Sequence, residues 1–194
     1  MLKLRATLAT GATTGSIETG GSQLIIVSPA LAADMLKGRP LPSVFEFRHL
    51  VEHREIDGLG HVNNVEYLRW MQDAAVAHSS AQGWPQQAYL SLGFGWVART
   101  HTIEYLSPAF QGDEIVVRTW VADMKRVTSL RRYEILRTAD LKSLAVASTN
   151  WAFVNFATNQ LSRVPPEVLQ AFELVPDSPA SGSETSKRDT VSSE

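Results

Sequence analysis

The segment from Asp57 to Asn64, with the sequence DGLGHVNN, combines residue types that could act on a carbonyl group. A carboxylate such as that of Asp57 can activate water as a general base, or attack an electrophilic carbon itself. The segment leads directly into a predicted helix, and the free N–H groups at a helix N-terminus can accept an oxyanion or a carbonyl oxygen. Carboxylate and electrophile site are therefore expected to be adjacent. Gly58 and Gly60 suit a turn in which the backbone approaches a substrate closely and φ can be positive.

Each polar residue of this segment also has a structural interpretation. Asp57 could form an Asx-turn, which is common in Asp-Gly sequences. His61 could orient water or shuttle a proton, or it could only cap the turn. Asn63 is better explained as the N-cap of the helix than as a catalytic residue, because Glu66 follows three positions later as in a capping box. Tyr67 is most simply a core aromatic, although its place one turn from the segment would also let it line a substrate tunnel.

The periodicity of the apolar residues predicts the elements that hold this segment. Two apolar stripes at helical spacing predict a broadly buried helix at 64–82, which Gly83 and the following Trp-Pro pair end. After this helix the sequence reads as strands alone until a short closing helix near 166–172. One helix inserted after the first strand of a largely antiparallel sheet predicts an α+β fold, with the sheet wrapped around the helix. The predicted strands are 44–53, 95–105, 114–124, 128–138 and 143–156.

The longer string HREIDGLGHVNNVEY, residues 53–67, resembles the active-site segment of hot-dog thioesterases. That group includes the 4-hydroxybenzoyl-CoA thioesterase family and the plant-type acyl-ACP thioesterases. The similarity extends over about residues 44–160, and residues 107–113, SPAFQGD, resemble the family's turn between its second and third strands. The resemblance implies the hot-dog fold, an antiparallel β-sheet around one long central α-helix. It also implies an acyl-CoA thioesterase, which hydrolyses an acyl-CoA to a free acid and CoA.

The resemblance also implies roles for single residues. Asp57 matches the family's catalytic aspartate, and the N–H of Asn64 matches the amide that polarises the thioester carbonyl. In the acyl-ACP branch the histidine that matches His61 is counted as catalytic, whereas in the hydroxybenzoyl branch this position is apolar. The acyl-ACP branch carries an Asn where this chain has Leu59. Side-by-side dimers with sites between the subunits, and tetramers of such dimers, are expected from the same resemblance.

Six residues are candidates for substrate binding: Gly60, Asn63, Tyr67, Trp96, Lys125 and Arg126. Trp96 lies on a predicted strand whose face could meet the acyl chain at a subunit boundary. Lys125 and Arg126, with Arg131 and Arg132 nearby, could bind the CoA phosphates, because phosphates select Lys and Arg donors. A basic hairpin of this kind could equally be solvated surface.

Three other functions remain open: an acyl-ACP thioesterase, a hot-dog hydratase or dehydratase that uses an Asp/His pair on the acyl β-carbon, and a non-catalytic acyl-CoA-binding module. No metal or other cofactor is expected, because His49 and His53 share a strand face without a third ligand at suitable spacing. The sequence contains no cysteine, which excludes a thiolate nucleophile. It also lacks the GxGxxG, GxxxxGK[ST] and GxSxG motifs of nucleotide-binding folds and serine hydrolases.

The composition is that of one globular domain: 194 residues, 44% hydrophobic and 20% charged. A net charge of -2 gives no basic field for nucleic acid, and no apolar run reaches the length of a membrane span. The predicted organisation is a flexible N-terminal extension at 1–40, a thioesterase domain at 41–175 and a disordered tail at 176–194. A cytoplasmic homo-oligomer of lipid metabolism is expected, with organelle targeting by the N-terminal extension left open.

Overall fold

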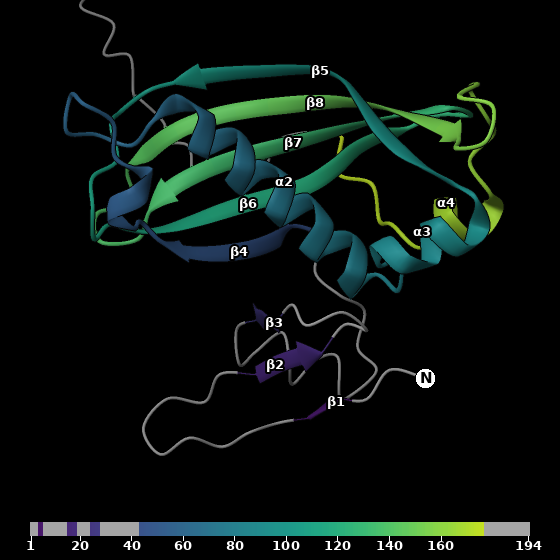
Figure 1. The fold of residues 1–194 in the computed structure, drawn as a ribbon, viewed down its shortest axis with the longest axis horizontal. Coiled ribbons are helices and arrows are strands. Elements are labelled where there is room, and N and C mark those ends of the chain that lie inside the picture. The colour runs from purple at the N-terminus through teal and green to yellow at the C-terminus, as the bar shows by residue number, and fades with distance from the viewer. Residues whose placement is uncertain (1–3, 6–14, 19–23, 28–42, 177–194) are drawn as a thin grey trace, which may run out of the picture.

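The computed structural model describes residues 4–5, 15–18, 24–27 and 43–176 of the chain. From residue 43 onward the chain forms an α+β domain with the hot-dog fold, in which one long helix lies against a five-stranded antiparallel sheet (Figure 1). Most of the proposed extension at 1–40 and nearly all of the proposed tail at 176–194 lie outside the described residues. The described strands β1 (Leu4–Arg5), β2 (Gly15–Glu18) and β3 (Leu24–Val27) pair in that order in a separate antiparallel sheet.

The five strands of the main sheet stand in the order β4-β6-β7-β8-β5, and every neighbouring pair is antiparallel. The predicted strands after the helix are confirmed to within one residue at each end, because runs rich in Val, Ile, Trp, Tyr and Thr and the turn residues between them mark the strands locally. The first strand is shorter than predicted, since the 3₁₀-helix η1 (His53–Glu55) follows it. The strands are β4 (Phe45–Leu50), β5 (Phe94–Tyr105), β6 (Glu114–Met124), β7 (Thr128–Arg137) and β8 (Ser143–Asn155).

Helix α2 (Asn64–Ala81) agrees with the prediction in position and in its broad burial. Asn63 is the N-cap, and its side-chain oxygen accepts from the Val65 N–H at 3.1 Å. The helix ends before Gly83, whose φ of +85° favours glycine. Its sheet-facing side combines bulky residues with small ones, which allows the backbone to approach the strands closely. The buried residues are Tyr67, Trp70, Met71, Ala74, Ala75, Ala77 and His78.

The stretch after α2 was predicted to contain strands alone, and this prediction is wrong. Residues 86–92 form a second helix, α3 (Gln86–Leu92), which the chain enters at Pro85 and leaves at Gly93 with φ +78°. The Trp84-Pro85 pair, which follows the end of α2, therefore also leads into the next helix, since proline is well suited to a helix start. The short closing helix is confirmed as α4 (Pro166–Gln170).

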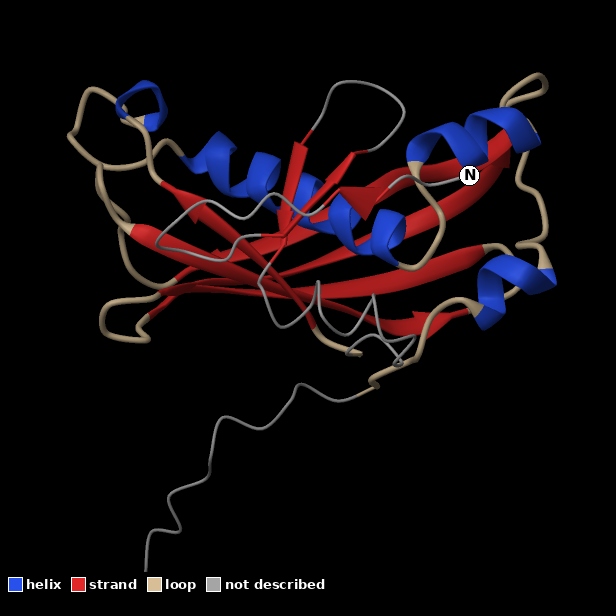
Figure 2. Cartoon of the chain, turned by 90° about the horizontal axis from the view of Figure 1, so that it is seen from below, coloured by secondary structure: helices blue, strands red, loops and turns tan. Residues whose placement is uncertain are grey.

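The core lies between α2 and the sheet, as the view from below shows (Figure 2). Trp70 and Met71 of α2 pack with Ile115 and Val117 of β6 and with Ile135 of β7, all of which are nearly inaccessible to solvent. Truncation of a buried side chain of this size usually costs about 3–5 kcal/mol. This packing fixes where α2 begins over the sheet, and so where the Asp57–Asn64 segment lies.

Candidate active site

The segment before α2 is a closed loop. The N–H of Asp57 donates to the carbonyl of His61 at 2.8 Å, and Ile56 and Val62 form an isolated antiparallel bridge. The N–H of Gly60 donates to the carbonyl of Asp57 at 3.1 Å, and Gly60 has φ +85°. The expectation of a positive φ is therefore confirmed for Gly60, whereas Gly58 does not have one. The loop holds Asp57 and His61 opposite each other where its two ends meet, and His61 is three residues before the first residue of α2.

The Asp57 carboxylate and the His61 ring form a pair at the surface, with Asp57 Oδ1 3.8 Å from His61 Nδ1. Their side chains are 29% and 41% exposed, so both can reach a bound molecule. Oδ1 of Asp57 also accepts from the Leu59 N–H at 2.8 Å, which is the Asx-turn considered from the sequence. The hydrogen bond from Leu59 occupies Oδ1 of Asp57. The other carboxylate oxygen has no donor within the described part of the chain.

The start of α2, which follows this loop directly, supplies a backbone donor. Asn63 is held on both sides, because its N–H donates to the carbonyl of Glu55 at 2.8 Å while its side chain caps Val65. The next N–H, that of Asn64, has no acceptor among the residues that the structure describes. The carbonyl of Asn64 accepts from the Tyr105 hydroxyl at 3.1 Å. The first turn of α2 is thus fixed by its neighbours and leaves an N–H free to bind an anionic oxygen.

Glu55 is buried under the loop and holds it to β4 and α2 through hydrogen bonds, a role that was not predicted from the sequence. Its carboxylate, in a side chain only 5% exposed, accepts from the Glu52 N–H, from Nε2 of His49 at 2.9 Å and from Nε1 of Trp70 at 2.9 Å. Burial raises the pKa of Glu55, but these hydrogen bonds outweigh it and hold the pKa below its usual value. The alternation of β4 places His49 on the same side as Phe45 and Phe47, facing the core. A histidine on a core-facing side needs a polar partner, and this was the signal in the sequence that could have pointed to Glu55.

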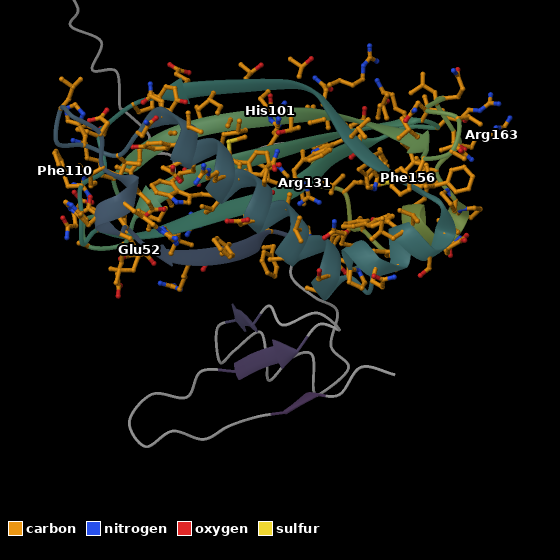
Figure 3. The ribbon with its side chains drawn as sticks, viewed as in Figure 1. Glu52, His101, Phe110, Arg131, Phe156 and Arg163 are labelled. Carbon is orange, nitrogen blue, oxygen red and sulfur yellow. The ribbon has the colours of Figure 1, made fainter. Side chains whose placement is uncertain are left out.

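Tyr67 ties α2 to the loop between β5 and β6. Its ring is in the core, as its structural interpretation predicts, and its hydroxyl accepts from the Ala109 N–H at 3.1 Å. The carbonyl of Ala109 in turn accepts from the Val62 N–H at 2.9 Å. Phe110 of the same loop lies edge-on to His61, with 6.2 Å between the ring centroids. Figure 3 shows Phe110 and Glu52 at the same end of the domain. A contact between Tyr67 and a substrate stays a prediction.

Known proteins identify the family and the fold of this chain. The family model of the thioesterase-like superfamily matches residues 51–172, which is more than half of the chain. The chain belongs to this superfamily. The 1,4-dihydroxy-2-naphthoyl-CoA thioesterase of Synechocystis superposes with a TM-score of 0.62 at 22% identity, over 66% of this chain and 94% of that one.

Two proteins of Staphylococcus aureus also superpose on this thioesterase-like domain. The DHNA-CoA thioesterase has a TM-score of 0.63 at 20% identity, over 66% of this chain and 87% of its own. A protein solved in complex with CoA has a TM-score of 0.63 at 16% identity, over 66% and 80%. At these identities the likenesses show the hot-dog fold.

The other predicted substrate-binding residues of this thioesterase-like chain lie away from the loop. Trp96 lines a cavity beside the second half of α2, with Trp84 and Tyr89. Lys125 and Arg126 are exposed in the turn between β6 and β7, where Lys125 pairs with Asp123 at 3.3 Å. The loop lies near the start of β6, and β6 spans 11 residues, about 36 Å at roughly 3.3 Å per residue. Within one subunit these residues cannot share a small substrate with Asp57.

Arg131 does not belong to that basic turn. The sequence grouped it with Arg132 as surface, but Arg131 is only 6% exposed and Arg132 is exposed. Along β7 the buried residues alternate, and Arg131 shares its face with Ser129 and Tyr133. The period of two was the signal that would have separated the two arginines.

The described residues contain no group of three or more metal-ligating side chains. None of the helices in the described ranges is long and apolar enough to cross a membrane.

Proposed function

We propose that this protein hydrolyses an acyl-CoA thioester to a free acid and CoA, with the reaction centred on Asp57 and the N–H of Asn64. The observation that carries the proposal is the pairing, at one helix start, of a partly exposed carboxylate with a backbone N–H that lacks an acceptor in the described chain. Membership of the thioesterase-like superfamily supports it. So do the CoA thioesters named for two similar structures and the CoA bound in a third.

Two routes fit the arrangement. In the first, Asp57 takes a proton from water as the water oxygen attacks the thioester carbon, and the C–S bond then breaks to release the thiol of CoA. In the second, Asp57 attacks the carbon and the C–S bond breaks, which releases CoA as its thiolate and leaves a mixed anhydride. Water then hydrolyses the anhydride to the free acid and restores the Asp57 carboxylate, and the proton that this step releases neutralises the thiolate. In both routes the Asn64 N–H stabilises the negative charge that develops on the carbonyl oxygen. In this proposal His61, whose Nδ1 is 3.8 Å from Oδ1 of Asp57, passes a proton to the departing sulfur.

The substitution Asp57→Asn tests the assignment. Asn keeps the oxygen that accepts from the Leu59 N–H, so the loop and the stability should be preserved. The turnover number should fall by about 10²–10⁴-fold, the usual contribution of a positioned acid or base. Asp73→Asn, which changes an exposed aspartate of α2, is the matched control and should leave turnover unchanged.

The assay is thiol release from a panel of short, long and aromatic acyl-CoAs, with acyl-ACP included. Turnover of Asp57→Asn within threefold of the wild type on the best substrate would remove Asp57 from the mechanism. Binding of acyl-CoA without thiol release would favour the non-catalytic module, and release from acyl-ACP alone would favour the carrier-protein substrate.

A side-by-side dimer is part of the proposal. β5 is an edge strand of the main sheet, and its exposed residues include Val97 and Tyr105. An unpaired strand edge of 12 residues is a natural site for pairing with a second copy. A dimer would also allow Lys125 and Arg126 of one subunit to approach the loop of the other. Sedimentation velocity tests this assembly, and a stable monomer would contradict the shared site. A place in lipid metabolism and a cytoplasmic location stay predictions.

A further inference from the structure

A cavity of about 370 Å³ lies beside the second half of α2, away from the Asp57 loop. Its wall is formed by α2, α3, the first part of β5 and the middle of the sheet, and it includes Ala75, Trp96 and Trp151. Most of this wall is apolar, and its volume is within the range of small-molecule sites. The residues of α2 that line it begin at Gln72, which is eight residues from Asn64 and about 12 Å away along a helix, and none of the lining residues belongs to the Asp57–Asn64 segment. The cavity is therefore a separate site within one subunit.

Arg131 is the charged residue of this wall, and Figure 3 shows it in the middle of the domain. One terminal nitrogen, Nη1, contacts Nδ1 of His78 at 2.8 Å and donates to Oγ1 of Thr119 at 3.2 Å. Burial, and then the charge of Arg131, hold the pKa of His78 well below its ordinary value, so the ring is neutral and can accept this bond. His78 and Thr119 are both uncharged, so neither compensates the positive charge of the guanidinium.

The described part of the chain provides no carboxylate within ion-pair distance of Arg131. Arginine stays protonated, and a cation that is 94% buried without an anion is costly unless something supplies the opposite charge. Nε and the second terminal nitrogen of Arg131 make no hydrogen bond to the described residues. A guanidinium presents these donors in a planar fork that fits the two oxygens of a carboxylate.

We propose that the cavity binds an apolar molecule that carries one carboxylate, with Arg131 as its charge partner. The apolar wall takes the body of the ligand and the guanidinium takes the carboxylate. The thioester group itself is uncharged, so the carboxylate belongs either to a free acid or to the far end of an acyl group. This inference does not depend on thioester hydrolysis at Asp57.

Isothermal titration calorimetry on the full chain tests it with two pairs of ligands, and in each pair one ligand carries the carboxylate and the other has an uncharged group in its place. In the first pair, 1-naphthoate should bind at least about 10-fold more tightly than 1-naphthamide, as expected for a charge-assisted hydrogen bond. In the second pair, suberyl-CoA is compared with octanoyl-CoA in the Asp57→Asn background, which limits turnover. A preference in the first pair assigns the site to free acids, and a preference in the second assigns it to acyl groups with a distal carboxylate.

Two arginine variants show where the preference arises. Arg131→Met should abolish the preference for 1-naphthoate and retain the affinity for 1-naphthamide, and Met can fill the buried position without an unpaired charge. Arg132→Met removes an exposed arginine next to it on β7 and should leave both affinities unchanged. Thermal unfolding verifies that each variant is folded.

Equal affinities within both wild-type pairs would overturn the proposal, because Arg131 would then already be neutralised. This comparison needs no variant, so it stands even if Arg131→Met fails to fold. A preference that survives in Arg131→Met, or that is lost equally in Arg132→Met, would also overturn it.

Discussion

Replacing Glu55 by Gln should destabilise the loop that carries Asp57, although Glu55 itself does not face a substrate. The carboxylate receives the Glu52 N–H on Oε2 and the Trp70 Nε1–H on Oε1, while Nε2 of His49 is 2.9 Å from both oxygens. A Gln amide has one acceptor oxygen, so in either orientation its NH₂ group faces one of these donors. A buried donor without an acceptor costs about 1–3 kcal/mol, and the charge of the acceptor is lost as well. We expect the free energy of unfolding at pH 7 to fall by about 2–4 kcal/mol.

The pH dependence provides a second, independent readout of the same substitution. Because the folded state lowers the pKa of Glu55, the stabilisation is present above the ordinary pKa near 4.5 and is lost as the pH falls through the folded value. In that window the unfolded chain binds more protons than the folded one, so wild-type stability should decline with acid. Glu55→Gln should lack this part of the decline.

Urea denaturation at pH 7 and at intervals down to pH 3 measures both effects. Glu173→Gln, an exposed position after α4 and away from the proposed dimer edge, is the matched control and should change the unfolding free energy by less than about 0.5 kcal/mol. A loss below about 0.5 kcal/mol for Glu55→Gln at pH 7, or an acid slope equal to that of the wild type, would refute the reasoning.

Two further predictions concern the loop and the buried histidine. Gly60→Ala should lower the free energy of unfolding by about 1–2 kcal/mol and reduce thiol release, because φ +85° strains any residue with a Cβ atom. Gly58→Ala changes the same loop at a residue without a positive φ and should cost far less stability. Equal losses for the two variants in urea denaturation would contradict this explanation. His78 is held neutral, so below its ordinary pKa of 6.5 the unfolded chain gains a proton that the folded chain does not, and stability should fall by up to about 1.4 kcal/mol per pH unit. His78→Gln keeps an acceptor for Arg131 and should remove this decrease of the unfolding free energy between pH 6.5 and 5. If the unfolding free energies of variant and wild type fall in parallel over this range, His78 is not the cause of the decrease.

Local signals were sufficient for most of the fold. Asn63 caps α2 and Gly83 follows its end, because capping and positive φ depend on the residue type at one position. The strands from Glu114 to Asn155 followed from runs of β-branched and aromatic residues and from the turn residues between them. α3 was missed because the Trp84-Pro85 signal, read as a stop, also serves as a helix start.

The sequence by itself therefore determined the hot-dog layout, the start of α2 and the position of Asp57 and His61 in one tight turn. Only the tertiary structure decided which charges are buried and what they meet. Glu55 contacts Trp70, which is 15 residues away in the sequence, and Arg131 contacts His78, which is 53 residues away. Both contacts depend on how α2 crosses the sheet. The same packing separates Trp96 and the basic turn from the Asp57 loop and encloses the cavity at Arg131. A site made by one turn can be predicted from neighbouring residues, whereas a cavity lined by six helices and strands exists only after they pack.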